Sequence, residues 1–247
     1  MKIVRCIVIV LMVLQVFACT QKTPALRIGI KADFPPFEFK ENNILTGFDV
    51  DLAKELGNRM GYKITFVEME FDELLPAIRE NKIDLAMSAI TINSQRRELV
   101  DFSLPYFSAD QVILARSDFE INITSEDDLS KFKIGTQNGT TGQYYLQYNL
   151  VDTDKLPWDQ LISFDNNDKA ISALINKDID LIIMDNTAAE AFCCIKPFKI
   201  CYTIPTEEKY GIALKKGSHL KTSINTALTE IMKSRLWNQM ITAYMCK

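Results

Sequence analysis

Short apolar runs alternate with segments whose apolar residues recur at helical spacing along most of this chain. Phe48, Leu52 and Leu56 follow one another at intervals of four residues and would therefore share one face of a helix. The runs 85–87 and 181–183 are short and continuously apolar, which is typical of buried strands. Alternating strands and helices predict an α/β protein with parallel sheets.

The chain repeats part of its pattern once. Residues 77–87 (AIRENKIDLAM) resemble residues 173–183 (ALINKDIDLII) at an offset of 96, and residues 27–31 (RIGIK) resemble residues 133–137 (KIGTQ) at an offset of 106. Both matches occur in the same order, and 247 residues are enough for two lobes of roughly 100–120 residues each. The repeat predicts two βαβ lobes of similar plan.

The repeat also locates a candidate binding region. In open parallel sheets, ligands bind beyond the carboxyl ends of the strands, where loops and helix N-termini converge. The corresponding loops of two facing lobes would line a cleft between them. These loops are residues 31–37, 88–96, 137–142 and 184–187.

Arg96 is a candidate anion ligand in the second of these loops. Asn93 or Ser94 is a natural N-cap, which places Arg96 in the first turn of a short helix. With the hydroxyl of Thr91 and free backbone N–H groups, its guanidinium would form a fork suited to a carboxylate. The alternative is that Arg96 belongs to a solvated face of this helix.

Asp185 ends an apolar strand, where a carboxylate needs a cation or hydrogen-bond donors. A ligand ammonium would be one such partner, and an N-cap role for the following helix is the alternative. Phe34 and Phe71 lie beside polar loops and could sandwich a ligand, or could belong to the core. The residues alone leave these alternatives open.

Composition and charge narrow the functional classes. The chain has 28 basic and 32 acidic residues, a net charge of −4 and no cluster of five or more Lys and Arg, so we expect no nucleic-acid partner. Its one histidine, His219, leaves little material for a histidine general base or a zinc site with two imidazoles. Residues 138–142 (NGTTG) lack the lysine of a nucleotide phosphate loop. We therefore expect neither a metal nor a cofactor.

The first residues have the pattern of a secretion signal. Two basic residues precede an apolar run over residues 7–14, which is too short to span a membrane, and a small residue precedes Cys19. Because the segment resembles a bacterial lipoprotein signal, we expect removal of residues 1–18, acylation of Cys19 and a lipid-anchored linker over residues 19–25. A buried N-terminal helix is the alternative.

Four cysteines remain beyond that region. Cys194 and Cys201 flank a short span that could bend back, so a disulfide between them is one expectation. The other is that Cys193, Cys194, Cys201 and Cys246 are all small buried hydrophobic side chains.

Five stretches together carry a specific resemblance: DFPPFEF (33–39), GFDVDLA (47–53), ITINSQR (90–96), DFSLPYF (101–107) and YGIA (210–213). Over residues 26–245 the chain resembles the periplasmic polar-amino-acid-binding proteins of ABC importers. The resemblance implies an α/β, bilobal periplasmic-binding-protein fold, with two βαβ lobes joined by a two-strand hinge and a ligand cleft between them. We expect lobe 1 to comprise residues 26–113 and 206–247, and lobe 2 residues 114–205.

The resemblance implies a role for each candidate ligand residue. Arg96 would bind the α-carboxylate of an amino acid, and Asp185 would bind its α-ammonium. By the same resemblance, the carboxylate would be assisted by Thr91, Thr141 and the backbone of Ser88 and Ala89, the side chain would be clasped by Phe34 and Phe71, and its far end would be contacted by Lys31 and Gln137.

Lys31 departs from the family pattern, since members for basic ligands often carry an acid at this position. The repeat places Lys31 opposite Gln137, at matching strand ends. Its ammonium would repel an arginine or lysine side chain. We therefore expect acidic and amide side chains to bind better than basic ones, unless Lys31 turns toward Glu38 or Asp33.

The resulting hypothesis is an extracytoplasmic, monomeric binding protein that is anchored to the membrane only by lipid. It would deliver a free amino acid to an ABC permease in the inner membrane without catalysing a reaction. One alternative is a periplasmic dehydratase on the same fold, which would need a general acid, and Asp185 and Glu38 are the evident cleft acids. The other is a ligand-sensing subunit of a signalling system, which would need a second membrane segment or an attached kinase.

Overall fold

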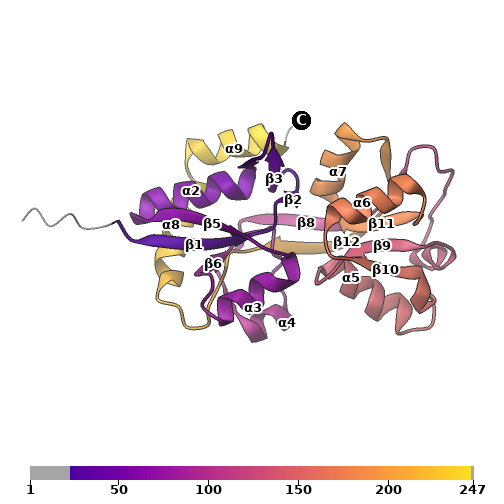
Figure 1. Ribbon diagram of the computed structural model, residues 1–247, viewed down its shortest axis with the longest axis horizontal. Coiled ribbons are helices and arrows are strands. Elements are labelled where there is room, and N and C mark those ends of the chain that lie inside the picture. Colours follow the sequence, from indigo (N-terminus) through magenta and orange to yellow (C-terminus); the bar gives the residue numbers. More distant parts are fainter. Residues whose placement is uncertain (1–22, 246–247) are drawn as a thin grey trace, which may run out of the picture.

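A computed structural model of the chain describes residues 23–245. They form two lobes, each built around its own five-stranded sheet (Figure 1). This arrangement confirms the bilobal α/β fold that the internal repeat predicts. The expected signal peptide (residues 1–18), Cys19 and Cys246 lie outside the described residues.

The first sheet is parallel at its centre and antiparallel at one edge. In spatial order its strands are β5 (Lys63–Glu68), β1 (Ala25–Ile30), β6 (Leu85–Ala86), β13 (Ala213–Leu214) and β7 (Asp101–Phe102). β1 pairs in parallel with β5 and β6, whereas β13 is antiparallel to β6 and β7. In this sheet β1 therefore lies between β5 and β6.

Two apolar clusters hold helices against this sheet. Phe48, Leu52 and Leu56 are all buried in one cluster with Ile28 and Leu228, as their spacing predicts. That cluster includes residues of α2 (Phe48–Met60), α8 (Leu220–Met232) and α9 (Arg235–Met245), and the other includes residues of α3 (Leu74–Arg79). The remaining elements of this lobe are α4 (Ser94–Leu99) and a small sheet of β2 (Asp33–Phe34), β3 (Glu38–Glu41) and β4 (Ile44–Thr46).

The second lobe repeats this plan. In spatial order its strands are β10 (Leu161–Phe164), β9 (Ile134–Gln137), β11 (Leu181–Asp185), β8 (Phe107–Arg116) and β12 (Phe198–Tyr210). β9 pairs in parallel with β10 and β11, just as β1 pairs with β5 and β6. The helices are α5 (Thr141–Leu146), α6 (Asn167–Asn176) and α7 (Asn186–Ile195), and short helical turns lie at Phe71–Glu73, Glu126–Lys131, Gln147–Val151 and Trp158–Gln160.

The repeat persists in the contacts between its strands. The Asp84 carboxylate accepts a hydrogen bond from the backbone N–H of Arg27 at 2.8 Å. At the matching positions of the second lobe, the Asp180 carboxylate accepts one from the backbone N–H of Lys133 at 2.9 Å. The aspartate just before β6 or β11 thus contacts the backbone of the neighbouring strand segment, β1 or the residue before β9, in the same way in both lobes.

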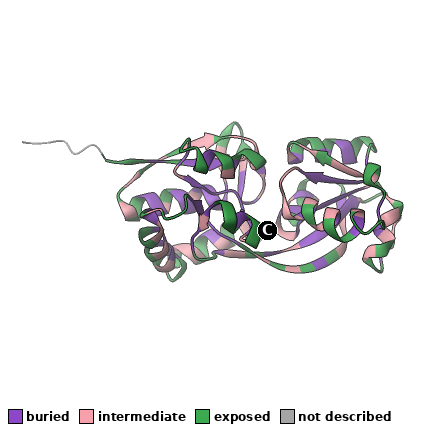
Figure 2. Ribbon diagram, turned by 90° about the horizontal axis from the view of Figure 1, so that it is seen from below, coloured by how far each residue is buried: buried purple, intermediate pink, exposed green. Residues whose placement is uncertain are grey.

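Two long antiparallel strands, β8 and β12, connect the lobes (Figures 1 and 2). Pairing of β8 with β11 starts at Gln111, so the part of β8 before Gln111 reaches toward the first lobe. The pairing register of β12 shifts between Ile204 and Glu208. The lobe boundaries expected at residues 113 and 206 fall within these two strands.

The described cysteines form no disulfide with one another. Cys193, Cys194 and Cys201 are free thiols. Cys194 is exposed, whereas Cys193 and Cys201 are half-buried. Neither expectation from the sequence therefore describes Cys194, which is neither bridged to Cys201 nor packed in a core.

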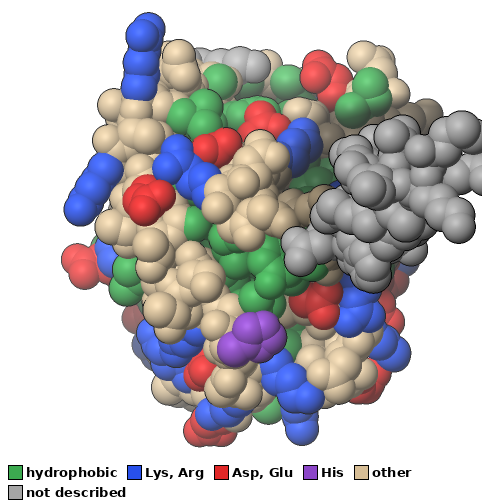
Figure 3. Space-filling view, turned by 90° about the vertical axis from the view of Figure 1, so that its left-hand side faces the viewer, with side chains coloured by type: hydrophobic (Ala, Val, Ile, Leu, Met, Phe, Trp, Pro, Cys, Tyr) green, Lys and Arg blue, Asp and Glu red, His purple; other side chains and the backbone are tan. Residues whose placement is uncertain are grey.

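The surface of the first lobe is mixed in charge. Figure 3 shows basic and acidic side chains interspersed over the outer end of this lobe. His219, which precedes α8, is exposed. Among residues 23–245, no helix is both long enough and apolar enough to cross a membrane.

Close packing of a glycine in β1 or β9 against the isoleucine that precedes β6 or β11 gives a test of the fold. A methyl group added at Gly135 would lie 2.4 Å from Cδ1 of Ile179, and one at Gly29 would lie 2.4 Å from Cδ1 of Ile83. We expect Gly135→Ala to lower the free energy of unfolding by about 1–3 kcal/mol through overpacking. In an Ile179→Val background, which lacks that methyl group, the loss should be smaller. Denaturant unfolding of the four proteins checks this, and equal losses in both backgrounds would contradict the packing described.

Candidate ligand-binding cleft

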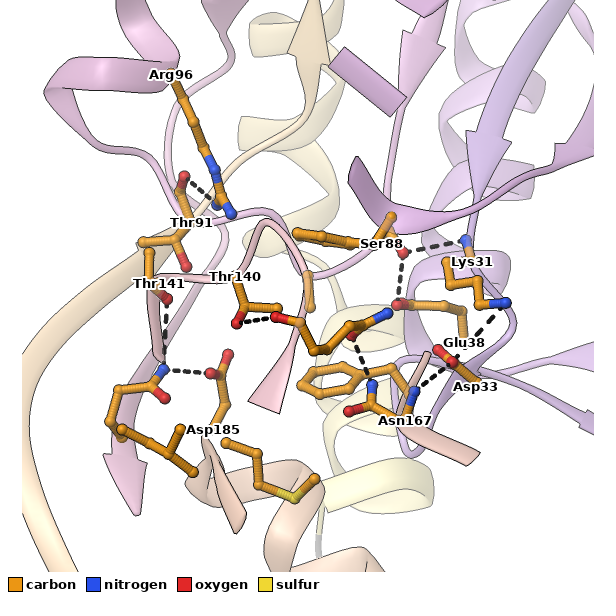
Figure 4. Close-up of a pocket in the computed structure, with 17 residues that line it drawn as sticks. Lys31, Asp33, Glu38, Ser88, Thr91, Arg96, Thr140, Thr141, Asn167 and Asp185 are labelled. Atoms are coloured by element: carbon orange, nitrogen blue, oxygen red, sulfur yellow. Dashed lines mark hydrogen bonds and ion pairs between the residues drawn. The ribbon is translucent and has the colours of Figure 1, made fainter. Parts of the chain in front are cut away.

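A cavity between the lobes contains every candidate ligand residue (Figure 4). It holds about 470 Å³ of empty space, part of it open to solvent, which is within the size range of small-molecule sites. The ten residues expected from the sequence all line it: Lys31, Phe34, Phe71, Ser88, Ala89, Thr91, Arg96, Gln137, Thr141 and Asp185. The strand topology explains this gathering, because Lys31 follows β1, Ser88 follows β6, Gln137 ends β9 and Asp185 ends β11.

Arg96 is buried in the cavity wall and is not part of a solvated helix face. Only 7% of the residue is exposed. Its guanidinium donates to the carbonyl oxygens of Thr91 at 2.9 Å and Gly139 at 3.0 Å, and the Phe71 ring lies 5.4 Å from it. It forms no ion pair with any acid of the described chain. Burial lowers its pKa, and the nearby charges of Glu208 and Asp185 offset part of this effect.

Local structure orients Arg96 into the cavity. Asn93 is the N-cap of α4, and its side chain accepts a hydrogen bond from the backbone N–H of Arg96 at 2.8 Å. Arg97, the next residue, is exposed. Adjacent arginines of one short helix thus differ completely in environment.

Asp185 occupies the N-cap position of α7, but its side chain does not cap the helix. It accepts short hydrogen bonds from the Gln111 amide and the Tyr210 hydroxyl instead. Burial, followed by the charge of Glu208, raises the pKa of Asp185 to about 7. A carboxylate with this environment favours the arrival of a positive charge.

Thr91 and Thr141 face each other from different lobes and share one partner. The Thr91 hydroxyl donates to Glu208 at 2.5 Å, and the Thr141 hydroxyl donates to the same carboxylate oxygen at 2.9 Å. The other oxygen of Glu208 accepts from the Gln111 amide at 3.2 Å. A residue of the connecting strand β12 therefore joins the hydroxyls of both lobes.

Ser88 and Ala89 have their donors engaged by acids of the first lobe. The Ser88 hydroxyl donates to Glu38 at 2.8 Å, and the Ala89 N–H donates to Asp49 at 2.9 Å. Burial raises the pKa of Asp49 to about 6, and burial together with the charge of Asp49 raises the pKa of Glu38 well above its usual range. The backbone N–H expected to assist Arg96 at Ala89 is thus already bound within the protein.

At the other end of the cavity, two carboxylates lie close to the positive charge of Lys31. The Lys31 ammonium lies 3.0 Å from the Glu70 carboxylate and 3.9 Å from that of Asp33. Across the cavity, the side-chain oxygen Oε1 of Gln137 accepts a hydrogen bond from the side-chain amide of Asn167 at 2.8 Å. Burial raises the pKa of Asp33 to about 6, and one of its oxygens is buried without a hydrogen-bond partner among the described residues.

The lobes touch around the cavity. Besides the bond from Arg96 to the carbonyl of Gly139, the backbone N–H of Asn167 donates to the Asp33 carboxylate at 2.9 Å. A further contact joins the Gln95 amide to the Tyr148 hydroxyl at 3.2 Å. The two lobes are therefore in direct contact on several sides of the cavity.

Several lining residues escaped the sequence argument: Gln111, Thr140, Asn167, Ile183 and Met184. Gln111 could have been found from the sequence, because it is a polar residue at the start of the apolar run VILA. In the structure it is almost fully buried. Nothing in the sequence marks Glu208, since strand β12 is polar at most positions around it.

Within residues 23–245 no group of three or more His, Cys, Asp or Glu side chains is arranged to hold a metal.

Residues 26–247 match the family described as bacterial extracellular solute-binding proteins, family 3. The chain belongs to this family. The probable histidine-binding protein of Campylobacter jejuni is 34% identical over 79% of this chain and 74% of the relative. The ABC transporter arginine-binding protein 1 of Escherichia coli is 31% identical over 83% of this chain and 84% of the relative. An ancestral arginine-binding protein bound to arginine is similar in structure, with a TM-score of 0.83 and 36% identity over 89% of this chain and 97% of that protein.

Because the pKa of Asp185 is raised in the folded protein, the stability of this family 3 protein should depend on pH. The folded protein keeps a proton on Asp185 at pH values where the unfolded chain has lost it, so this contribution to stability declines as pH rises through about 7. Between pH 5 and pH 8, ligand-free Asp185→Asn should gain about 1–3 kcal/mol of unfolding free energy relative to wild type. Asp159→Asn, at an exposed site, should gain none. Denaturant unfolding at both pH values checks this, and a difference independent of pH would contradict it.

Proposed function

We propose that the cleft binds a free polar amino acid and that the protein delivers it to the permease of an ABC importer. The observation that carries this proposal is the buried guanidinium of Arg96, which has no acidic partner within 4 Å among the described residues. A buried cation is costly unless an anion compensates it. A ligand carboxylate would supply that anion with bidentate geometry.

The second ligand group that the cleft would bind is the α-ammonium of the amino acid. Asp185 is the strand-end acid whose charge is disfavoured by burial and would be favoured beside a ligand cation. Gln111 and Tyr210 fix the orientation of its carboxylate. One end of the cavity thus offers a cation and an anion to a zwitterion.

We further propose that the ligand side chain is basic. The expectation of an acidic or amide ligand required a free ammonium at Lys31, but Glu70 and Asp33 face that ammonium. One cation against two carboxylates leaves this end of the cavity negative, and Asp33 has a free acceptor oxygen. The names of the histidine- and arginine-binding relatives support the same assignment.

The protein binds its ligand without converting it, on this proposal. Asp185 is held by two donors beside the proposed ammonium position, and Glu38 is engaged by Ser88 and lies against Asp49, so the cleft acids are committed to structure and binding. We place the protein outside the cytoplasm, in keeping with its family, and propose that Cys19 carries a lipid anchor after removal of residues 1–18.

Replacing Arg96 tests the anchor. Arg96→Ala should weaken binding of the amino acid by roughly 30- to 4000-fold, because the ligand carboxylate would be left unpaired in a desolvated cleft. Arg97→Ala is the matched control, since Arg97 lies next in the chain and is exposed. Isothermal titration calorimetry measures both. Equal affinities of wild type and Arg96→Ala would contradict the proposed role.

A panel of the twenty amino acids tests the side-chain assignment. L-arginine or L-histidine should raise the melting temperature more than L-glutamate does, because bound ligand stabilises the folded state according to its affinity. Asp33→Asn should weaken the binding of L-arginine by about tenfold, which corresponds to the loss of a charge–charge interaction of roughly 1–2 kcal/mol. It should weaken the binding of L-glutamine by less, because the side chain of glutamine is neutral. If L-glutamate instead gives the largest shift, the cavity is not selective for basic side chains.

A further inference from the structure

Two buried carboxyl groups lie beside the cavity without a counter-ion. Glu38 of β3 is 1% exposed and Asp49 of α2 is 0% exposed, and their side chains are within hydrogen-bonding reach of each other. Neither forms an ion pair with a basic residue of the described chain. Two ionised carboxylates in contact would repel each other at a buried position, where even one uncompensated charge is costly.

The donors around the pair satisfy one oxygen of each carboxyl group. Oε1 of Glu38 accepts a hydrogen bond from the Ser88 hydroxyl at 2.8 Å. Oδ2 of Asp49 accepts two, from the backbone N–H of Ala89 at 2.9 Å and from the Tyr106 hydroxyl at 2.8 Å. The remaining oxygens, Oε2 of Glu38 and Oδ1 of Asp49, are buried and have no partner among the described residues. A single hydrogen between these two oxygens would satisfy both.

The neighbouring groups assign this proton to Glu38. Asp49 has two donors and Glu38 has one, so the negative charge is better stabilised on Asp49. Asp33 of β2 is the other acid that acts on Glu38, and its charge also disfavours ionisation of Glu38. Burial and the charge of Asp49 raise the pKa of Tyr106 well above its usual range, so the Tyr106 hydroxyl remains a donor.

The pair supports the loop that follows β6. Ser88 and Ala89 both line the cavity, and both donate to the pair, as Figure 4 shows for Ser88 and Glu38. Ala89 has a positive φ of 46°, which residues other than glycine rarely adopt. Its bond to Asp49 holds the backbone in this conformation. The first two residues of the loop are therefore each tied to one of the two carboxyl groups.

We propose that Glu38 and Asp49 share one proton in the folded protein and that the resulting pair positions residues 88–91 in the wall of the ligand cavity. The proton lies between Oε2 of Glu38 and Oδ1 of Asp49. The pair then carries one negative charge, which the shared proton, the Ala89 N–H and the Tyr106 hydroxyl stabilise on Asp49. The positioning role rests on the proposed function for its ligand, whereas the shared proton does not.

The pH dependence of unfolding tests the shared proton. The pKa values of both acids are raised in the folded protein, so it keeps a proton that the unfolded chain loses above about pH 4, and this contribution to stability falls as pH rises. Glu38→Gln keeps a donor toward Asp49 and an acceptor toward Ser88 but cannot titrate. From pH 5 to pH 8, the unfolding equilibrium constant of wild type should rise relative to that of Glu38→Gln by about tenfold per pH unit. Glu41→Gln removes an exposed acid of the same strand and should show no such change relative to wild type.

Infrared spectroscopy detects the same proton in the wild-type protein. At pH 8, where exposed acids are ionised, wild type should retain a carboxylic acid C=O band that shifts in D₂O. Glu38→Gln should lack this band, and Glu41→Gln should retain it. No band in wild type, a band that persists in Glu38→Gln, or a ratio of unfolding constants that is independent of pH overturns the shared proton.

Calorimetry with L-arginine tests the positioning role. Glu38→Ala removes both the acceptor for Ser88 and the donor for Asp49, so the loop must be ordered when the ligand binds. Its dissociation constant should exceed that of Glu38→Gln by about 5- to 150-fold, the range for one buried hydrogen-bonding group left unpaired. Equal dissociation constants of the two variants overturn the positioning role. If none of the twenty amino acids binds wild type, the proposed function is wrong, and unfolding and infrared spectroscopy still decide the shared proton because neither uses a ligand.

Discussion

The buried guanidinium of Arg96 is the constraint around which the cleft is organised. It is held by two carbonyl oxygens, one from each lobe, and by the ring of Phe71. Carbonyl groups orient a guanidinium but do not neutralise it, so the site remains short of one negative charge close to Arg96. The guanidinium that we propose as the anion ligand therefore also contacts both lobes.

The cleft also contains several acids, and their environments differ. Asp185 and Asp33 line the cavity, where burial raises the pKa of each, to about 7 and about 6. Glu38 and Asp49 lie together behind Ser88 and Ala89, where they accept hydrogen bonds that shape the loop after β6. Among the described residues, this combination of a buried cation without an ion pair and acids with raised pKa values supports our proposal of a zwitterionic ligand with a basic side chain.

The sequence predicted the fold and the positions of the candidate residues because both follow from the repeat. Strand ends at matching positions of two βαβ units converge on one cleft, and this depends on the backbone topology and not on side-chain conformation. The placement of Arg96 and Asp185 at the cleft could therefore be predicted from the sequence. The pairing of Lys31 with Glu70 could not, since it depends on side-chain rotamers. Nor could the contact between Thr91 and Glu208, which are 117 residues apart and meet only because β12 returns between the lobes.

Our central proposal is that Arg96 binds the α-carboxylate of a free amino acid in the cleft between the lobes and that Asp185 binds its α-ammonium. A crystal structure of the protein with L-arginine tests it most directly. We predict that the ligand carboxylate pairs with the guanidinium of Arg96 and that the ligand ammonium lies beside the carboxylate of Asp185. A bound amino acid whose carboxylate lies away from Arg96 would contradict the proposal.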